Sequence, residues 1–268
     1  MSGIEISESE YKLAKVLSLY NSLAVAFSGG VDSSLLSFMA NKYVKGKVLL
    51  INVFSPFSTA KEAVFVEKWA ADKNYELEVI KLNPLNSEQI KSNSKERCYY
   101  CKKLIMSELI KIAAKHSIEY VADGTNQDDL EDCRPGNKAA DELGIKHPFL
   151  EAGITKNEIR EMARENNLEN WDRPSSACLA SRIPFGKSLE ESDLRRIEKA
   201  EEFLHQFGFM HCRVRLIGES AKIELPVAIV DEIMPLRKEI VEQLKNLGFK
   251  GVFLDLEGYR QGALNEGI

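Results

Sequence analysis

Residues 23–34 read Leu-Ala-Val-Ala-Phe-Ser-Gly-Gly-Val-Asp-Ser-Ser, and they are the most informative part of the sequence about the fold. Its first five residues form an apolar run typical of a buried strand, and residues 33–42 are helix-forming. A Gly-Gly pair therefore lies between a strand and a helix, where glycine allows a sharp turn. The same rhythm continues, with strands expected over 48–54, 77–82 and 120–122 and helices over 7–20, 59–72 and 102–115. This alternation predicts an α/β fold with a doubly wound parallel sheet.

The pattern changes in the second half of the chain. A polar segment over 124–136 precedes helices near 138–143 and 155–166 and a long loop over 171–186. Beyond residue 190 we expect a helix to about 206, strands near 212–216 and 222–225, a helix over 236–246 and a last strand over 252–256. We therefore predict two domains, residues 1–188 and a smaller α+β domain over residues 189–268.

Composition excludes several classes of protein. The 268 residues are 44% hydrophobic and 29% charged, with a formal net charge of −5, which is ordinary for a globular protein and unlike a fibrous or disordered one. Residues 1–10 lack the basic start and apolar run of a secretory signal, so we expect a soluble, cytoplasmic protein with no membrane role. The acidic balance gives no general attraction to nucleic acid. Five sparse cysteines indicate thiols or a metal centre rather than disulfides.

The segment from Ser28 to Ser33 has the chemistry of a phosphate-binding loop. Gly29 and Gly30 let the backbone approach an anion, the following helix start offers free N–H groups, and the serine hydroxyls add donors. Asp32 would repel phosphate, so its natural role is through Mg²⁺. A Gly-Gly pair can also be only a strand-to-helix turn, but the strand, loop and helix together favour a polyphosphate site.

Residues 28–33 resemble the signature of the PP-loop ATPases, the superfamily related to NAD and GMP synthetases. Further segments narrow the resemblance to the LarE family of ATP-dependent sulfur transferases: 97–102, 122–126, 132–136, 174–186, 213–215 and 256–260. This resemblance implies a Rossmann-like PP-loop fold, with ATP and Mg²⁺ as cofactors. It also implies that residues 1–188 form the ATP-binding adenylation domain with the cysteine loop. Residues 189–268 would then bind the substrate phosphate and contribute contacts in a homo-oligomer.

The family's reaction belongs to the synthesis of the nickel-pincer cofactor of lactate racemase. A carboxylate of the small-molecule substrate, pyridinium-3,5-biscarboxylic acid mononucleotide, is adenylated, and a cysteine thiolate displaces AMP. Cleavage of the Cβ–S bond then leaves a thiocarboxylate on the substrate and dehydroalanine on the enzyme. By resemblance, Cys178 is the sulfur donor. Arg173 and Arg182 lie in the same loop and would lower the pKa of its thiol, and Arg182 is also a candidate substrate contact. The alternative for Cys178 is a small buried side chain.

Five more residues are candidates for nucleotide or phosphate binding. Gly124 and Thr125 follow the strand over 120–122, at the edge where open α/β sheets bind ligands, unless they form only a turn. Arg134 resembles an arginine of the family that would contact phosphate or the adenylate. Arg213 and Arg215 are two apart, so on a strand they share a face and would clamp the mononucleotide phosphate; the alternative is a solvated basic edge.

Alternatives remain open for Cys98, Cys101 and the reaction. The two cysteines form a Cys-Xaa-Xaa-Cys pair that, together with Cys178, would supply three ligands to an iron–sulfur cluster. They can equally lie at the aromatic, basic start of a helix that lines the nucleotide pocket. Other functions to weigh are a cluster-dependent sulfur transferase acting on this substrate or on tRNA, an ammonia-using synthetase, and a nucleotide-sensing module. The acidic chain disfavours the tRNA reading.

Overall fold

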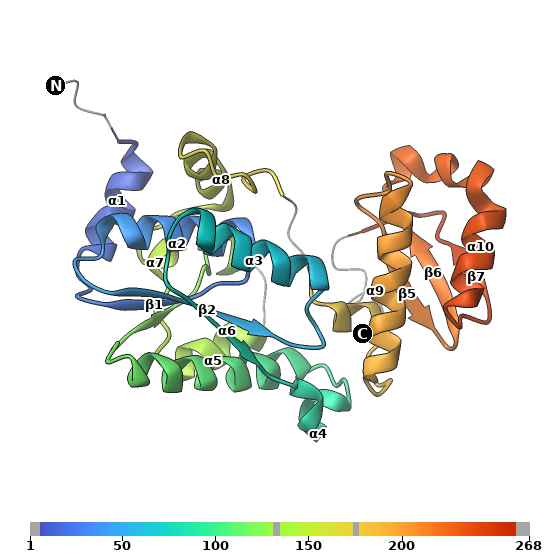
Figure 1. Cartoon of the computed structure of the whole chain (residues 1–268), viewed down its shortest axis with the longest axis horizontal. Coiled ribbons are helices and arrows are strands. Elements are labelled where there is room, and N and C mark those ends of the chain that lie inside the picture. The colour runs from blue at the N-terminus through green and yellow to red at the C-terminus, as the bar shows by residue number, and fades with distance from the viewer. Residues whose placement is uncertain (1–5, 131–134, 174–176, 261–268) are drawn as a thin grey trace. The chain divides into compact units, whose positions relative to one another are not determined.

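The computed structural model describes residues 6–130, 135–173 and 177–260 (Figure 1). Backbone contacts divide the chain into two compact units. The first comprises residues 1–55, 60–84 and 98–176, and the second comprises 56–59, 85–97 and 177–268. The loop that carries Cys178 therefore groups with the second unit, although residues 177–188 were expected in the first.

The first unit is built on a parallel sheet. Its strands are β1 (Leu23–Ala26), β2 (Val48–Phe54), β3 (Leu77–Lys81) and β4 (Val121–Ala122), in the order β3-β2-β1-β4. All three pairings are parallel, and Ala24 is in register with Leu49 on one side and Val121 on the other. The chain thus runs outward from β1 to β3 and returns to the other side of β1. The carboxyl ends of β1 and β4 flank the topological switch point, where open α/β sheets bind ligands.

Helices cover both faces of this sheet, which confirms the predicted doubly wound fold (Figure 1). Val25 packs with residues of the helices on one face, and its neighbour Ala24 packs with those on the other, as the two-residue period of a strand requires. The first face carries α1 (Glu8–Leu17), α2 (Val31–Tyr43), α3 (Ala60–Asp72), α7 (Pro148–Glu151) and α8 (Lys156–Glu165). The second carries α5 (Arg97–Lys115) and α6 (Pro135–Glu142), and η2 (Gln127–Leu130) is a short 3-10 turn.

The second unit contains a mixed sheet, as predicted for a smaller α+β domain. Its strands β5 (Arg213–Ile217), β6 (Ser220–Glu224) and β7 (Val252–Leu254) lie in that order. The first pair is antiparallel and the second is parallel. Its other elements are α4 (Glu88–Lys91), η3 (Leu179–Arg182), α9 (Glu191–Gln206), η4 (Val227–Leu236) and α10 (Arg237–Asn246), and η1 (Pro84–Asn86) lies where the chain enters this unit.

Some predicted boundaries were wrong. The helix expected from residue 102 begins at Arg97, so the Cys-Tyr-Tyr-Cys segment is its first turn. Arg97, at the start of this helix, is buried and donates to Asn93 Oδ1 and the Ala180 carbonyl. The contact with Ala180 joins distant parts of the chain, so no local pattern in the sequence indicates it. The helix expected from 138 begins at Pro135, a residue favoured at a first helical position. Over the described part of the chain, no helix combines the length and apolarity needed to cross a membrane.

Candidate functional site

The chain turns sharply between β1 and α2. Gly29 has a φ of +79°, and a Cβ there would lie 3.0 Å from side-chain atoms of both Phe65 and Val66, so the backbone and the packing each favour glycine. Gly30 differs. Its φ is −75°, and a Cβ at this position would have Ser28 Oγ as its nearest atom at 3.6 Å, an ordinary contact. Gly30 is exposed, so the lack of a side chain leaves its backbone open to a ligand.

The Ser33 hydroxyl holds the loop together. Its Oγ donates to the Gly30 carbonyl at 3.1 Å, accepts from the Ser28 N–H at 3.2 Å, and lies 3.1 Å from Ser28 Oγ. The first intrahelical bond of α2 runs from Ser34 N to Gly30 O, and no side chain caps this helix within the described residues. The first turn therefore presents backbone N–H groups and the positive end of the helix dipole, which suits an anion.

Two asparagines that were not among the predicted site residues support this loop. Asn170 is 4% exposed, and its Nδ2 donates to the Gly29 carbonyl at 3.1 Å and to Ser34 Oγ at 2.9 Å. Asn52 on β2 donates from Nδ2 to the Phe27 carbonyl at 2.7 Å. A polar residue inside the apolar run 48–54 was an available signal for Asn52. Asn170 is an isolated loop residue and gave none.

The loop after β4 touches the loop after β1. A Cβ on Gly124 would lie 2.9 Å from Asp32 Cβ and 3.2 Å from Ser33 N, so only glycine allows this approach. The structure thus brings Gly124 against the first turn of α2. Thr125 is next to it and donates its N–H to Asp123 Oδ1 at 3.1 Å. The two segments expected to border the nucleotide meet at the switch point of the sheet.

Asp123 anchors a buried polar cluster beneath this point. It accepts from Lys102 Nζ at 2.6 Å and pairs with His147 Nδ1 at 2.7 Å, and His147 Nε2 lies 3.2 Å from Asp141 Oδ1. Burial acts to raise the pKa of Asp123, but Lys102 and His147 outweigh it and hold that pKa well below its usual range. Burial acts to lower the pKa of His147, but Asp123 and Asp141 outweigh it, so the pKa is raised.

Asp32 forms an ion pair that no motif in the sequence indicated. Lys156 Nζ, at the start of α8, lies 2.5 Å from each carboxylate oxygen of Asp32. Burial is the largest influence on Asp32 and raises its pKa, while Lys156 opposes that shift. A carboxylate beside a phosphate loop fits Mg²⁺, which takes one or two protein carboxylates and completes its shell with water and phosphate oxygens. Asp32 is the residue that would hold the ion.

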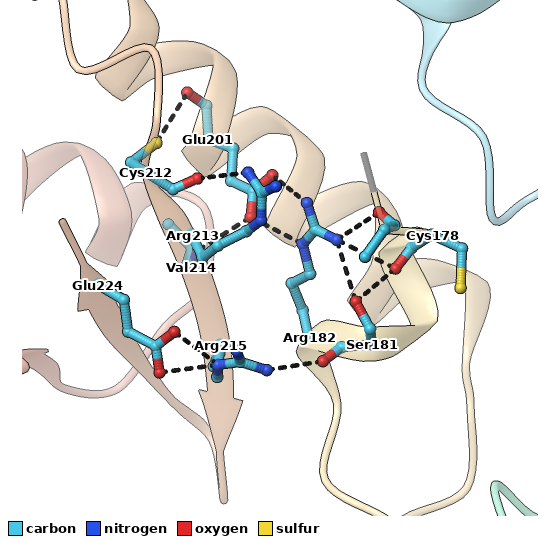
Figure 2. Close-up of polar contacts among 10 residues, drawn as sticks. Cys178, Ser181, Arg182, Glu201, Cys212, Arg213, Val214, Arg215 and Glu224 are labelled. Carbon is cyan, nitrogen blue, oxygen red and sulfur yellow. Dashed lines mark hydrogen bonds and ion pairs between the residues drawn. The ribbon is translucent and has the colours of Figure 1, made fainter. Parts of the chain in front are cut away.

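Cys178 lies in the second unit, directly before η3 (Figure 2). Its carbonyl accepts from Ser181 N at 2.9 Å, from Ser181 Oγ at 2.7 Å and from Arg182 Nη1 at 3.1 Å. The residue itself is exposed, and its sulfur points away from the Arg182 guanidinium. The backbone of Cys178 is therefore fixed while its thiol remains accessible.

Arg182, which was expected to lie near the thiol or the substrate, is buried and paired with Glu201. It is 3% exposed and donates from Nε and Nη2 to the two oxygens of Glu201 at 3.0 and 3.2 Å, and from Nη1 to the carbonyls of Ala177 and Cys178 (Figure 2). Glu201 is also buried and accepts from Val214 N at 2.9 Å. A buried guanidinium needs a carboxylate partner, and this requirement ties residues 177–182 to α9 and β5.

Arg213 and Arg215 lie on one face of β5, as their spacing predicted, because the residue between them is buried and they are not. Their partners differ. Arg215 Nε is 2.7 Å from both oxygens of the buried Glu224, and its Nη1 donates to Ser181 O. Arg213 donates to the Cys212 carbonyl, and its guanidinium lies 5.3 Å from the Tyr259 ring centroid. Among the described residues, Arg213 has no carboxylate partner.

The remaining candidates are Arg134 and the cysteines other than Cys178. Arg134 lies outside the described residues. Cys98 and Cys101 lie in the first turn of α5 in the first unit, and Cys178 lies in the second. No group of three or more His, Cys, Asp or Glu side chains within the described ranges is arranged to hold a metal ion, and the cluster stays a prediction. Burial raises the pKa of Cys212 to about 12, so this thiol is inert.

These features define an α/β protein of the doubly wound class with a glycine-rich loop at its switch point. Residues 22–166 match a family of unknown function, DUF7411. The chain is 34% identical to the pyridinium-3,5-bisthiocarboxylic acid mononucleotide synthase of Lactiplantibacillus plantarum, over 91% of this chain and 89% of that protein. It therefore belongs to the LarE family, which includes this synthase. An uncharacterized protein of Synechocystis sp. is 35% identical over 90% of this chain and 91% of its own length. An uncharacterized protein of Methanocaldococcus jannaschii is 34% identical over 92% of this chain and 98% of its own length.

Proposed function

We propose that this chain is an ATP-dependent sulfur transferase that acts on pyridinium-3,5-biscarboxylic acid mononucleotide and donates the sulfur of Cys178. The observation that carries the proposal is the state of Cys178, whose carbonyl is held by three hydrogen bonds while its thiol is exposed. A nucleophile needs this combination of a fixed backbone and an accessible reactive atom. The name of the Lactiplantibacillus plantarum relative supports the substrate class.

The first unit would perform the adenylation. ATP binds with its phosphates at the Gly29–Gly30 turn and the first turn of α2, whose N–H groups and dipole favour anions. A substrate carboxylate oxygen attacks the α-phosphorus, the bond to the β-phosphate oxygen breaks, and pyrophosphate leaves. Mg²⁺, when held by Asp32, screens the phosphate charge.

The second unit would supply the sulfur. The Cys178 thiolate attacks the acyl-adenylate carbon and releases AMP, which gives a thioester. A base then takes the Cα proton of Cys178, the electron pair forms the Cα=Cβ bond, and the Cβ–S bond breaks with its electrons on sulfur. The products are a thiocarboxylate and a dehydroalanine residue. No oxidant or reductant is needed, and one sulfur leaves each chain.

Arg213 is the better candidate for the substrate phosphate than Arg215. Arg215 is bound to both oxygens of Glu224, which is 1% exposed and also pairs with Lys222, so releasing Arg215 would take one of two counter-charges from a buried carboxylate. Arg213 is bound only to a carbonyl and a tyrosine ring among the described residues, so its guanidinium can accept a phosphate at lower cost. Arg213→Gln should raise the KM for the mononucleotide, and the ATP affinity should stay unchanged.

The decisive experiment measures the mass of the intact protein after anaerobic reaction with ATP, Mg²⁺ and the mononucleotide, followed by peptide mapping across Cys178. A mass loss equal to H₂S at that residue, with thiolated product, is the expected result. Thiolated product from a chain of unchanged mass would contradict the sacrificial step and favour a cluster or persulfide as donor. Full turnover by Cys178→Ala would refute a role for this sulfur and favour another adenylating reaction.

A further inference from the structure

Lys156 occupies the position at Asp32 that a metal ion would need. Its Nζ lies at equal distances of 2.5 Å from the two carboxylate oxygens. Both side chains are partly buried, with 23% of Lys156 and 29% of Asp32 exposed. A magnesium ion bound to the same oxygens would lie next to the ammonium group, and the two cations would repel each other. The Asp32 carboxylate can therefore bind either the ammonium group or the magnesium ion, but not both tightly at once.

The backbone of Lys156 is held in place, so only its side chain can move away from Asp32. Its N–H donates to Asp128 Oδ2 at 3.0 Å, and the preceding Thr155 forms a capping box with Glu158 that fixes the start of α8. The buried face of α8 packs in the same core as α2, the helix that carries Asp32. The ammonium group can therefore move only as far as its side chain reaches, over the first turn of α2 and the loop before it.

The charges around this pair favour an exchange of partners. Asp129 adds negative potential at Asp32, and Asp128 lies against the Lys156 backbone. When the ammonium leaves, the carboxylates that remain attract a divalent cation. A nucleotide on the neighbouring loop brings phosphate oxygens, which are strong partners for an ammonium group.

We propose that Lys156 is a phosphate-binding residue that takes the place of the metal ion at Asp32 in the free protein and moves to the nucleotide phosphates when Mg²⁺–ATP binds. This inference rests on the proposed use of the Gly29–Gly30 loop for ATP. It adds a second cation to that site and explains how the carboxylate of Asp32 stays paired in the absence of ligand. The exchange breaks one ion pair and forms two, and no covalent bond changes.

The test uses Lys156→Gln and two binding measurements by titration calorimetry on the full chain. The first ligand is α,β-methylene ATP in EDTA, an analogue that cannot release pyrophosphate. We expect about tenfold weaker binding by the variant, because the phosphates lose a charged donor and meet an unpaired Asp32. The second ligand is Mg²⁺ alone. We expect the variant to bind it at least about threefold more tightly, because the competing ammonium is gone.

The variant is expected to bind the ATP analogue more weakly and Mg²⁺ more tightly, and these opposite changes separate a phosphate-binding role from a structural one. A variant that is merely distorted would bind both ligands more weakly, and that result, or unchanged binding of both, would overturn the proposal. Lys12→Gln is the matched control, because it removes one positive charge from an exposed pair with Glu8, and it should leave both affinities at wild-type values. Failure of the wild-type chain to bind the ATP analogue would instead refute ATP binding by the loop.

A second measurement needs no variant. Acetylation of lysines in the wild-type chain by a limiting dose of an N-hydroxysuccinimide ester, read by peptide mass mapping, reports the accessibility of Lys156. Saturating Mg²⁺ alone should increase its labelling, since the ion displaces the ammonium from Asp32. Mg²⁺ with the ATP analogue should reduce the labelling below that of the free protein. Labelling that is the same in all three states would contradict the exchange.

Discussion

The buried ion pair between Arg182 and Glu201 gives a sharp prediction for the stability of the second unit. Glu201→Gln keeps the shape of the side chain but removes its charge and one of its two acceptor oxygens. In the wild type, three donors share the two carboxylate oxygens of Glu201, namely Arg182 Nε, Arg182 Nη2 and Val214 N. The variant therefore removes the negative charge that Glu201 places beside a guanidinium that is 3% exposed.

The expected cost follows from this burial. Removing one partner of a buried ion pair costs about 3–5 kcal/mol, because the remaining charge stays desolvated. Glutamine still accepts one hydrogen bond, so we expect the lower end, about 3 kcal/mol. With a urea m value of about 1.5 kcal/mol per M, the unfolding midpoint should fall by about 2 M.

Urea denaturation monitored by two probes measures this effect. Trp69 and Trp171 both lie in the first unit, so tryptophan fluorescence reports that unit, while far-UV circular dichroism reports both. The loss of stability should appear in the dichroism transition. Glu219→Gln is the control, because Glu219 forms an exposed pair with Lys250 and should leave the midpoint unchanged.

A decrease of less than about 1 kcal/mol in Glu201→Gln would refute this reasoning, since that is the range of an exposed pair. The same variant should slow thiolation, because Arg182 holds the Cys178 carbonyl. In Arg182→Met combined with Glu201→Leu, an apolar pair replaces the charges. We expect this double variant to be more stable than Glu201→Gln and still slow in sulfur transfer. Wild-type transfer by the double variant would show that the pair does not position the cysteine.

Three further predictions concern the first unit. Gly29→Ala should lower the free energy of unfolding by about 1–3 kcal/mol because of its φ of +79°, whereas Gly30→Ala should unfold like the wild type but bind ATP more weakly; thermal unfolding and calorimetry check both. Asn170→Ala should cost about 1–3 kcal/mol in urea denaturation, since two buried hydrogen bonds to the loop are lost, and a wild-type midpoint would contradict that support. The pKa of His147 is raised in the folded protein, so its pairing with Asp123 stabilises the fold fully below about pH 6.5, and this stabilisation is lost as the pH rises through the folded-state pKa. Urea midpoints should therefore fall more between about pH 6 and about pH 9 in the wild type than in His147→Asn, and equal slopes would refute this coupling.

Local patterns in the sequence determined much of the fold. The apolar runs 23–27 and 48–54 and the helix between them follow from side-chain periodicity, which is a property of neighbouring residues. The helix expected over 155–166 forms over Lys156–Glu165, and Thr155 and Glu158, three positions apart, cap its start. The family was also evident from short motifs, and the comparisons confirmed it.

Which charges meet depends on how distant parts of the chain pack together. Lys156 reaches Asp32 across 124 residues of chain, and Asn170 reaches Gly29 across 141. No local pattern marks these residues, because a lysine at a helix start or an asparagine in a loop has the same sequence context when it is solvated. Arg182 is a similar case. Its motif indicated a functional residue, but its partners follow from its burial beside Glu201, which no local pattern indicates. Sequence periodicity records which side chains avoid water, whereas the pairing of buried charges depends on the packing of whole elements.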